Sequence, residues 1–299
     1  MRFGIFYEHQ LPRPWHEGDE LRLFQHALDQ VELADRLGID NAWEVEHHFL
    51  EEYSHSSAPE VFLAACSQRT KNIRLGHGIT LMPPNYNHPA RVAERIATLD
   101  LVSNGRVEWG TGESSAQLEL GGYRVPVEEK RSQWQEAVEQ CANMLAMDPY
   151  PGFDGQYFSM PCRNVVPKPV QRPHPPLTIG GYGPTVIKRA VTLGDGFNGG
   201  NVPLAQVAPL VAQVKDAARE AGRDPAELHI VSRGTYVAHD APQGDGRRPL
   251  WGTLAEIRED IAHYAEAGLT ELFLEPNFQP GGADVDRVLD TMEQLAPKR

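Results

Sequence analysis

The sequence predicts an α/β fold, a single (β/α)8 TIM barrel. Short apolar runs alternate with longer amphipathic stretches along the chain, and this alternation indicates parallel strands joined by right-handed helical crossovers. The alternation reaches eight strand–helix pairs, and the eighth helix ends the chain. A doubly wound open sheet is the alternative architecture, but eight such pairs are the number that closes a barrel.

The first half of the chain contains four of these pairs. Strands are expected over 2–7, 40–45, 73–81 and 106–111, and helices over 19–37, 58–69, 89–102 and 129–147. The stretch 19–37 shows how the helices are recognised, because its apolar residues recur every three or four positions. Gly38 follows it as a typical helix end.

An insertion separates the two halves. Prolines are dense and no period is visible over 148–176, so we expect an ordered loop between the fourth helix and the fifth strand, with a short hairpin at GQYFSM. The later strands are expected over 176–181, 196–200, 229–238 and 271–275, and the later helices over 184–194, 203–221, 253–268 and 284–295. A polar loop is expected over 239–249. Residues 1–299 would then form one domain.

Charge and composition exclude several classes of protein. The chain has 28 basic and 41 acidic residues, a net charge of −13, so a nucleic-acid partner is not expected. No apolar run approaches the ~18 residues of a membrane span, and the N-terminus lacks the pattern of a signal peptide. The chain has three cysteines, which lie far apart in the sequence and form no CxxC pair. This pattern indicates a reducing compartment. We therefore expect a cytoplasmic protein with no disulfides.

Functional residues of such a barrel collect where the strands end. The residues at these positions are Tyr7, Glu8 and His9, then Glu46, His47, His48 and Phe49, then Ile79, Thr80, Leu81 and Met82, then Gly112, Glu113 and Ser114, then Gly180, Gly181, Tyr182 and Gly183, then Gly199, Gly200 and Asn201, and finally Glu275, Pro276 and Asn277. Glu8, Glu46 and Glu275 can converge there, so a carboxylate-dependent hydrolase stays open as an alternative.

The segment IGGYGPT, residues 179–185, has the pattern of a phosphate-binding loop. Glycines after a strand allow backbone N–H groups to point at one place, and Pro184 opens a helix whose N-terminus favours an anion. A plain glycine-rich turn is the alternative. The segment is not a dinucleotide-binding fingerprint, because no acidic ribose partner follows in the expected context.

The run Glu46-His47-His48 is the second candidate site. Neighbouring residues on an extended segment point in opposite directions, so both histidines are unlikely ligands of one ion, and no metal is expected. One histidine is either a hydrogen-bonded structural residue or a proton-handling group beside a bound ligand. No GxSxG or SxxK motif is present. Cys66 lies on an apolar helix face and is expected to be core.

Four segments resemble the bacterial luciferase-like superfamily of flavin-dependent oxidoreductases, including its deazaflavin-dependent branch. They are NAWEVEHHF (41–49), LGHGITLMPPNYNHPARVAERIATLDLVSNGRVEWGTG (75–112), PLTIGGYGPTVIKRAVTLGDGF (176–197) and WGTLAEIREDIAHYAEAGLTELFLE (251–275). They follow the family's order and cover nearly the whole chain. The resemblance implies a TIM barrel that binds FMN, or a deazaflavin coenzyme, at its C-terminal mouth.

The resemblance also implies roles for particular residues. The flavin phosphate would lie near Gly112, Glu113 and Ser114 and near the backbone of Gly181, Tyr182 and Gly183. The flavin ring would lie over the third strand at Gly78, Ile79 and Thr80, with a non-prolyl cis peptide between Gly78 and Ile79. His47 would correspond to the catalytic histidine of the luciferase branch.

The implied activity is that of a two-component monooxygenase. A separate flavin reductase would supply reduced FMN, and one oxygen atom of O2 would enter a small organic substrate. A deazaflavin-dependent hydride transfer is the alternative, and a non-catalytic flavin-binding protein is the third. The expected helices 58–69 and 89–102 carry apolar residues on more than one stripe, and family members pair through this region, so a homodimer is expected.

Overall fold

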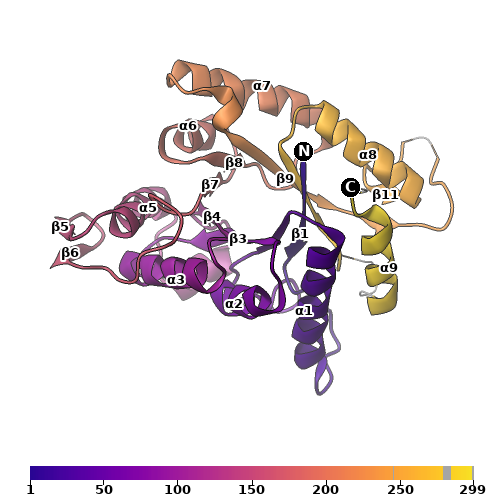
Figure 1. Cartoon of the computed structure of the whole chain (residues 1–299), viewed down its shortest axis with the longest axis horizontal. Helices are drawn as coiled ribbons and strands as arrows, with labels where there is room; N and C mark the ends of the chain where they lie inside the picture. Colours follow the sequence, from indigo (N-terminus) through magenta and orange to yellow (C-terminus); the bar gives the residue numbers. More distant parts are fainter. Residues whose placement is uncertain (245, 279–283, 298–299) are drawn as a thin grey trace.

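The centre of the molecule is a closed barrel of parallel strands. The computed structural model describes residues 1–244, 246–278 and 284–297. Within them, eight strands close in the order β1-β12-β9-β8-β7-β4-β3-β2, with helices around the outside (Figure 1). The strands are β1 (Arg2–Tyr7), β2 (Asn41–Glu44), β3 (Arg74–Leu81), β4 (Val107–Gly112), β7 (Leu177–Gly180), β8 (Gly196–Asn198), β9 (His229–Thr235) and β12 (Glu271–Glu275). The predicted (β/α)8 fold is confirmed.

Each barrel strand is followed by a helix that packs on the outside. These helices are α1 (Asp19–Leu37), α2 (Pro59–Arg69), α3 (Pro89–Val102), α5 (Lys130–Ala146), α6 (Pro184–Leu193), α7 (Leu204–Glu220), α8 (Leu254–Glu266) and α9 (Val285–Leu295). Their bounds agree with the predicted ranges to within two residues. A short helix, α4 (Gln117–Gly122), was not predicted, and it lies between β4 and α5. A 3-10 turn covers Pro225–Glu227.

The barrel is closed by the pairing of its first and last strands. β1 pairs with β12, where Arg2 lies opposite Glu271, and with β2, where Gly4 lies opposite Asn41. All the barrel pairings are parallel, so the carboxyl ends of the strands meet at one mouth. This mouth is where the residues of the candidate site come together.

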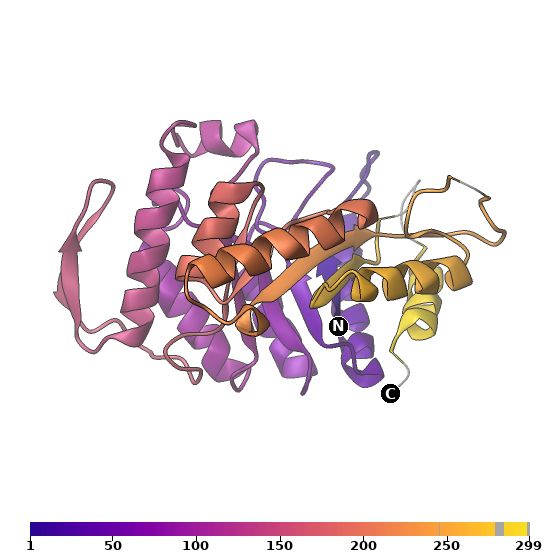
Figure 2. The same cartoon turned by 90° about the horizontal axis from the view of Figure 1, so that it is seen from above.

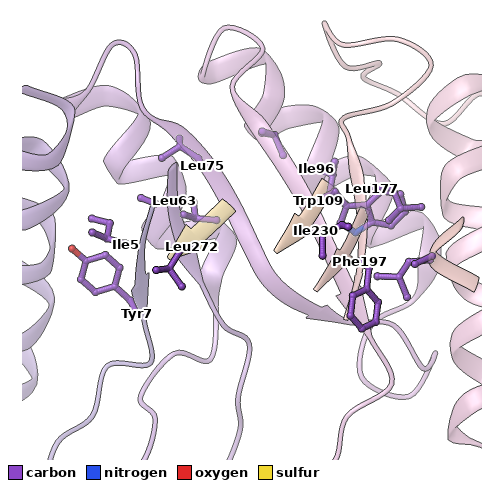
Figure 3. Packing of buried hydrophobic residues seen from close by; sticks show 14 of the residues in the cluster. Ile5, Tyr7, Leu63, Leu75, Ile96, Trp109, Leu177, Phe197, Ile230 and Leu272 are labelled. Atoms are coloured by element: carbon purple, nitrogen blue, oxygen red, sulfur yellow. The ribbon is translucent and has the colours of Figure 1, made fainter. Parts of the chain in front are cut away.

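Two apolar layers hold the barrel. The larger one lies between the strands and the helices, and Figure 3 shows part of it. The smaller one fills the inside, where Phe6 and Phe273 stack with ring centroids 5.0 Å apart. Gly76 leaves room for the Trp43 ring, because an added Cβ would lie 2.3 Å from it. The barrel is therefore a packed core and not a pore.

The predicted insertion contains a hairpin. β5 (Tyr150–Asp154) and β6 (Ser159–Arg163) pair antiparallel, and the Gly155 N–H donates to the Phe158 carbonyl across the turn. Figure 2 shows this hairpin at one edge of the molecule, beside α5. In the predicted polar loop, residue 245 lies outside the described residues. The strand predicted over 229–238 is divided, because β10 (Val237–Ala238) pairs separately with β11 (Trp251–Gly252).

Candidate functional site at the barrel mouth

Charged side chains from several strands meet at the mouth. Glu8 follows β1, His47 follows β2, Arg233 belongs to β9, and Glu275 ends β12. The strands that build the core therefore also position these charges. Glu8 and Glu275 are almost completely buried, with exposed fractions of 1% and 0%. Buried carboxylates need partners, and Arg233 supplies one to both.

Arg233 connects the two carboxylates. Its Nη1 donates to Glu8 Oε1 (2.5 Å), its Nη2 donates to Glu275 Oε2 (2.6 Å), and its guanidinium carbon lies 4.7 Å from the centre of the Phe6 ring. Burial alone would lower the pKa of Arg233, but the carboxylates of Glu275 and Glu8 raise it above its ordinary value. Burial raises the pKa of Glu275, and Arg233 opposes that effect. The guanidinium is therefore a fixed positive charge.

His47 lies between two carboxylates. Its Nδ1 donates to Glu119 Oε1 (2.7 Å), and its Nε2 lies 3.6 Å from Glu8 Oε2. Burial lowers the pKa of His47, but the hydrogen bond to Glu119 and the charge of Glu8 outweigh it and raise the pKa above 6.5. The imidazole side chain keeps 20% of its surface exposed. The two carboxylates thus favour the protonated form of His47, and its Nε2 lies toward Glu8 at the mouth.

Glu119 comes from α4, the helix that the sequence did not predict. It is fully buried and accepts hydrogen bonds from His47, from Ser114 Oγ (2.7 Å) and from the His48 N–H (2.9 Å). Burial raises the pKa of Glu119, but the bonds from His47 and Ser114 lower it below 4.5 overall. Ser114, predicted as a phosphate ligand, therefore has its hydroxyl hydrogen occupied by Glu119.

His48 points to a different cluster, as expected for neighbouring residues. Its Nε2 lies 3.2 Å from Glu46 Oε1, and its Nδ1 lies 3.2 Å from the Tyr123 hydroxyl. The rings of Tyr86, Tyr123 and Phe49 pack around it. His48 is therefore held among aromatic rings, while His47 faces the charged cluster.

The ends of β3, β4 and β7 form a smooth apolar arc opposite these charges. Ile79 packs against Gly112 and Gly180, where an added Cβ would lie 2.1 Å and 2.9 Å from its side chain. Glycine at both positions allows this approach. We call Ile79, Gly112 and Gly180 the glycine arc. The side chain of Thr80 is not part of it, because it lines a small polar cavity with His77 and Glu60 behind the barrel wall.

The predicted cis peptide between Gly78 and Ile79 was wrong. In the described chain the cis peptide bonds all precede proline. The end of β3 is shaped differently, since the register with β4 shifts between His77 and Thr80, as in a β-bulge. With this bulge, the Ile79 side chain packs against Gly112 and Gly180 without a cis bond.

Basic side chains gather beside the loop that follows β4. Glu113 pairs with Arg131 (3.3 Å) and lies 3.9 Å from Lys130 Nζ. Lys130 also donates to the Ser114 carbonyl (2.5 Å). Burial and the charge of Arg131 lower the pKa of Arg189. The carboxylate of Glu113 is thus neutralised, and the surroundings carry net positive charge.

The predicted phosphate loop is partly available as a donor site. The Gly181 N–H donates to the Asn198 carbonyl (3.1 Å), so it is not free for a ligand, contrary to expectation. The N–H groups of Tyr182 and Gly183 make no hydrogen bond with the described residues and stand at the start of α6. Tyr182 is 75% exposed, and its hydroxyl reaches over Gly200. Because β7 pairs with β4, this loop adjoins the basic cluster.

Sequence reasoning missed several residues of the site. Arg233 had a signal, since it is a lone charge inside the apolar strand segment HIVSRGTYVA. Glu119 had none, because α4 is too short to show a helical period. Tyr53, whose hydroxyl donates to Glu8 Oε1 (2.9 Å), and Lys130 lie where only the fold brings them to the mouth.

Metal-ligand clusters and membrane-spanning helices are both absent from the part of the chain that the structure describes. No group of three or more histidine, cysteine, aspartate or glutamate side chains is arranged to hold a metal ion. No described helix combines the length and apolar character needed to cross a membrane. Cys66 is fully buried in the core, as predicted.

Known proteins resemble this chain in fold and in part of its sequence. The family model of the luciferase-like monooxygenases matches residues 1–244. The oxygenase component of the flavin-dependent trigonelline monooxygenase of Acinetobacter baylyi is 30% identical over 215 residues, 70% of this chain and 55% of that protein. An F420-dependent glucose-6-phosphate dehydrogenase of Amycolatopsis mediterranei is 31% identical over 170 residues, 55% of this chain and 50% of that protein.

A solved structure matches over a greater length. The monooxygenase RslO1 of Streptomyces bottropensis has a TM-score of 0.86 and 26% identity, with 99% of this chain and 98% of that chain covered. The chain spans about half the length, or less, of the first curated relatives it matches. With the family model covering most of its residues and the barrel mouth built as described, the chain belongs to the luciferase-like monooxygenase family.

Proposed function

We propose that the chain is the oxygenase component of a two-component flavin-dependent monooxygenase. The substrate would be a small organic molecule that receives one atom of O2, while the other atom leaves as water with two electrons that reduced FMN would supply. The similarity to an oxygenase component supports a separate flavin reductase as the partner. The observation that carries the proposal is the partly exposed His47 imidazole, held at the barrel mouth between Glu119 and Glu8.

The residues at the mouth fit a flavin. The glycine arc offers a surface without protruding side chains except Ile79, against which a flat ring can lie. The N–H groups of Tyr182 and Gly183, with Lys130 and Arg131 nearby, suit a phosphate. Bound FMN would supply the electron transfer to oxygen. The chain would orient it, exclude water and present the Nε2 proton of His47 to the reacting group.

Anaerobic titration with reduced FMN tests this proposal. Arg131→Ala should weaken reduced FMN about tenfold, as expected for loss of a charge-assisted contact to phosphate, and should leave reduced riboflavin unaffected. Arg36→Ala is the matched control, because Arg36 is also an exposed arginine with one carboxylate partner, but at the far end of α1. No binding of reduced FMN to the wild type, with tight binding of a reduced deazaflavin, would contradict the proposal.

A deazaflavin-dependent hydride transfer is the second candidate. Glu8 Oε2 lies beside His47 Nε2, so a base and an acid face the same point, and this arrangement suits removal of a proton from an alcohol as hydride leaves its carbon. The similarity to F420-dependent dehydrogenases supports it. Turnover with the deazaflavin under nitrogen would separate it from the first candidate, which requires oxygen.

We also propose a homodimer in the cytoplasm, with the outer faces of α2 and α3 as the contact. Val61 is 66% exposed there, and Leu101 and Val102 lie exposed at the end of α3. In contrast, Ala93 and Ala97 are buried in the core and cannot reach a partner. A monomeric mass by light scattering at micromolar concentration would contradict the dimer.

A further inference from the structure

A recess at the mouth is not used by the flavin-binding surfaces. It has a volume of about 590 Å3 and is lined by the loops that follow β1, β2 and β12 and by one face of α1. β1 and β12 are not paired with any strand of the glycine arc, and only β2 adjoins it, through β3. A volume of this size suits a small organic molecule. Leu11, Leu23 and Phe278 give it apolar walls.

Two wall residues join the recess to the charged cluster. The Tyr53 hydroxyl donates to Glu8 Oε1 (2.9 Å), and its ring centre lies 5.7 Å from that of His47. Gln10 donates through Nε2 to Glu275. Both side chains also line the recess. A molecule in the recess therefore touches residues that hold Glu8 and Glu275 in place.

The hydrogen-bonding groups of the recess are largely satisfied from within. Gln30 and Asn277 bond to each other through both amides (3.0 Å each), and Asp19 accepts from Arg22. Among the buried polar atoms, Gln10 Oε1 on the recess wall and Glu8 Oε2 in the adjoining charged cluster are acceptors that receive no hydrogen bond from the described residues. A ligand that completes them must bring donors.

We propose that this recess binds the substrate as a mainly apolar molecule with an O–H or N–H group at one end. The apolar body contacts Leu11, Leu23 and Phe278, and the donor end bonds to Gln10 Oε1 or reaches Glu8 Oε2 beside His47. The assignment deepens the proposed function by naming its substrate class, and in that sense it rests on it. The recess itself can be tested without flavin.

Ligand-observed NMR on the flavin-free protein provides the test. Cyclohexanol and cyclohexylamine are the donor-bearing probes, and cyclohexyl methyl ether is the probe without a donor. The wild type should bind one donor-bearing probe about tenfold more tightly than the ether, as expected for one hydrogen bond to a buried acceptor. A tighter alcohol or a tighter amine then identifies which donor the site takes.

A matched pair of variants locates the binding. Leu23→Trp fills the recess from α1 and should weaken the preferred probe at least about tenfold. Leu21→Trp makes the same change two residues away, at a position 66% exposed and outside the recess, and should leave binding unchanged. If Leu23→Trp does not fold, Gln10→Leu removes the free acceptor without filling the recess and should abolish the preference over the ether.

Three results would overturn the inference. They are equal affinity of the wild type for the alcohol, the amine and the ether, no binding of any probe up to roughly 10 mM, and equal binding by the Leu23→Trp and Leu21→Trp proteins. Because reduced FMN is titrated separately, a chain that binds reduced FMN but gives any of these results keeps its proposed function and loses this substrate class.

Discussion

Both ends of the barrel contain an arginine between two buried glutamates, but the surroundings differ. At the N-terminal end, Arg2 pairs with Glu108 (3.0 Å) and Glu271 (2.8 Å). At the mouth, Arg233 pairs with Glu8 and Glu275. The two arrangements use the same residue types on strands of one barrel, so they show what makes a charged cluster structural or functional.

The difference lies in how closely the second carboxylate oxygen is paired. Glu271 Oε1 accepts from Asn41 (2.7 Å) and from the Trp43 indole (2.6 Å), while its Oε2 lies 2.8 Å from Arg2. The hydrogen bonds to Glu8 go to Oε1, and its Oε2 lies 3.6 Å from the partly exposed His47. The cluster of Arg2, Glu108 and Glu271, which we call the bottom cluster, thus closes the barrel. The cluster at the mouth keeps an acceptor and a donor for a ligand. This agrees with the usual TIM barrel, in which the N-terminal end serves stability and the C-terminal end serves function.

The largest expected effect follows from removing the donor at the mouth. His47→Ala should lower turnover about 10²–10⁴-fold, the usual contribution of a positioned acid, while reduced FMN still binds. Oxygen should then be consumed without product and appear as hydrogen peroxide. Steady-state turnover and peroxide assays on the purified variant measure both quantities.

His48→Ala is the internal control for this change. His48 is held by Glu46 and Tyr123 and faces away from Glu8, so its loss should affect turnover less than the loss of His47. A larger loss for His48→Ala at matched folding would mean that His48 is the acid. Equal and small losses would make both histidines structural.

The second prediction concerns the bottom cluster. Glu271→Ala leaves Arg2, Asn41 and the Trp43 indole facing a missing carboxylate, so the free energy of unfolding should fall by about 3–5 kcal/mol. Turnover per folded molecule should stay near that of the wild type. Denaturant unfolding and active-site titration measure the two. A loss of turnover greater than the loss of folded protein would contradict the claim that the bottom cluster is only structural.

A smaller effect is expected in the glycine arc. Gly112→Ala places a Cβ about 2.1 Å from Ile79 Cδ1, so the Ile79 side chain must turn into the mouth. Such crowding costs about 1–3 kcal/mol. We expect weaker binding of reduced FMN with a modest fall in stability. Unchanged FMN affinity would show that the ring does not lie against this arc.

The smallest effect is a pH dependence of stability from His47 and Glu119. Because the pKa of His47 is raised in the folded protein, its interactions with Glu119 and Glu8 stabilise the fold fully below pH 6.5. This stabilisation is lost as the pH rises through the folded pKa. Because the pKa of Glu119 is lowered in the folded protein, the hydrogen bonds that it accepts from His47 and Ser114 stabilise the fold fully above pH 4.5. This stabilisation is lost as the pH falls through the folded pKa. Glu119→Gln should therefore destabilise by about 1–3 kcal/mol between these limits and less outside them. Thermal unfolding of both proteins from pH 4 to 9 measures this, and a constant difference would contradict it.

The sequence predicted the elements with a clear period and missed those without one. The eight barrel strands and their helices were predicted from the alternation of apolar runs, and the burial of Cys66 was predicted from its position on an apolar helix face. Glu119 was not found, because α4 has six residues and its partner His47 is far away in sequence. The cis bond expected at Gly78 was wrong, since the bulge in β3 depends on pairing with β4, which no local pattern records.

The NMR signals of the histidine side chains give the most direct test of a flavin site at His47. Histidine-labelled protein is examined by NMR while reduced FMN is added without oxygen, with His47 assigned from the His47→Gln variant. We predict that the imidazole signals of His47, which is 20% exposed at the mouth, shift as FMN binds, while those of His229, which lies against Arg2 at the other end, do not. Binding of reduced FMN that leaves His47 unchanged, or that shifts both histidines equally, would contradict a flavin site built around His47.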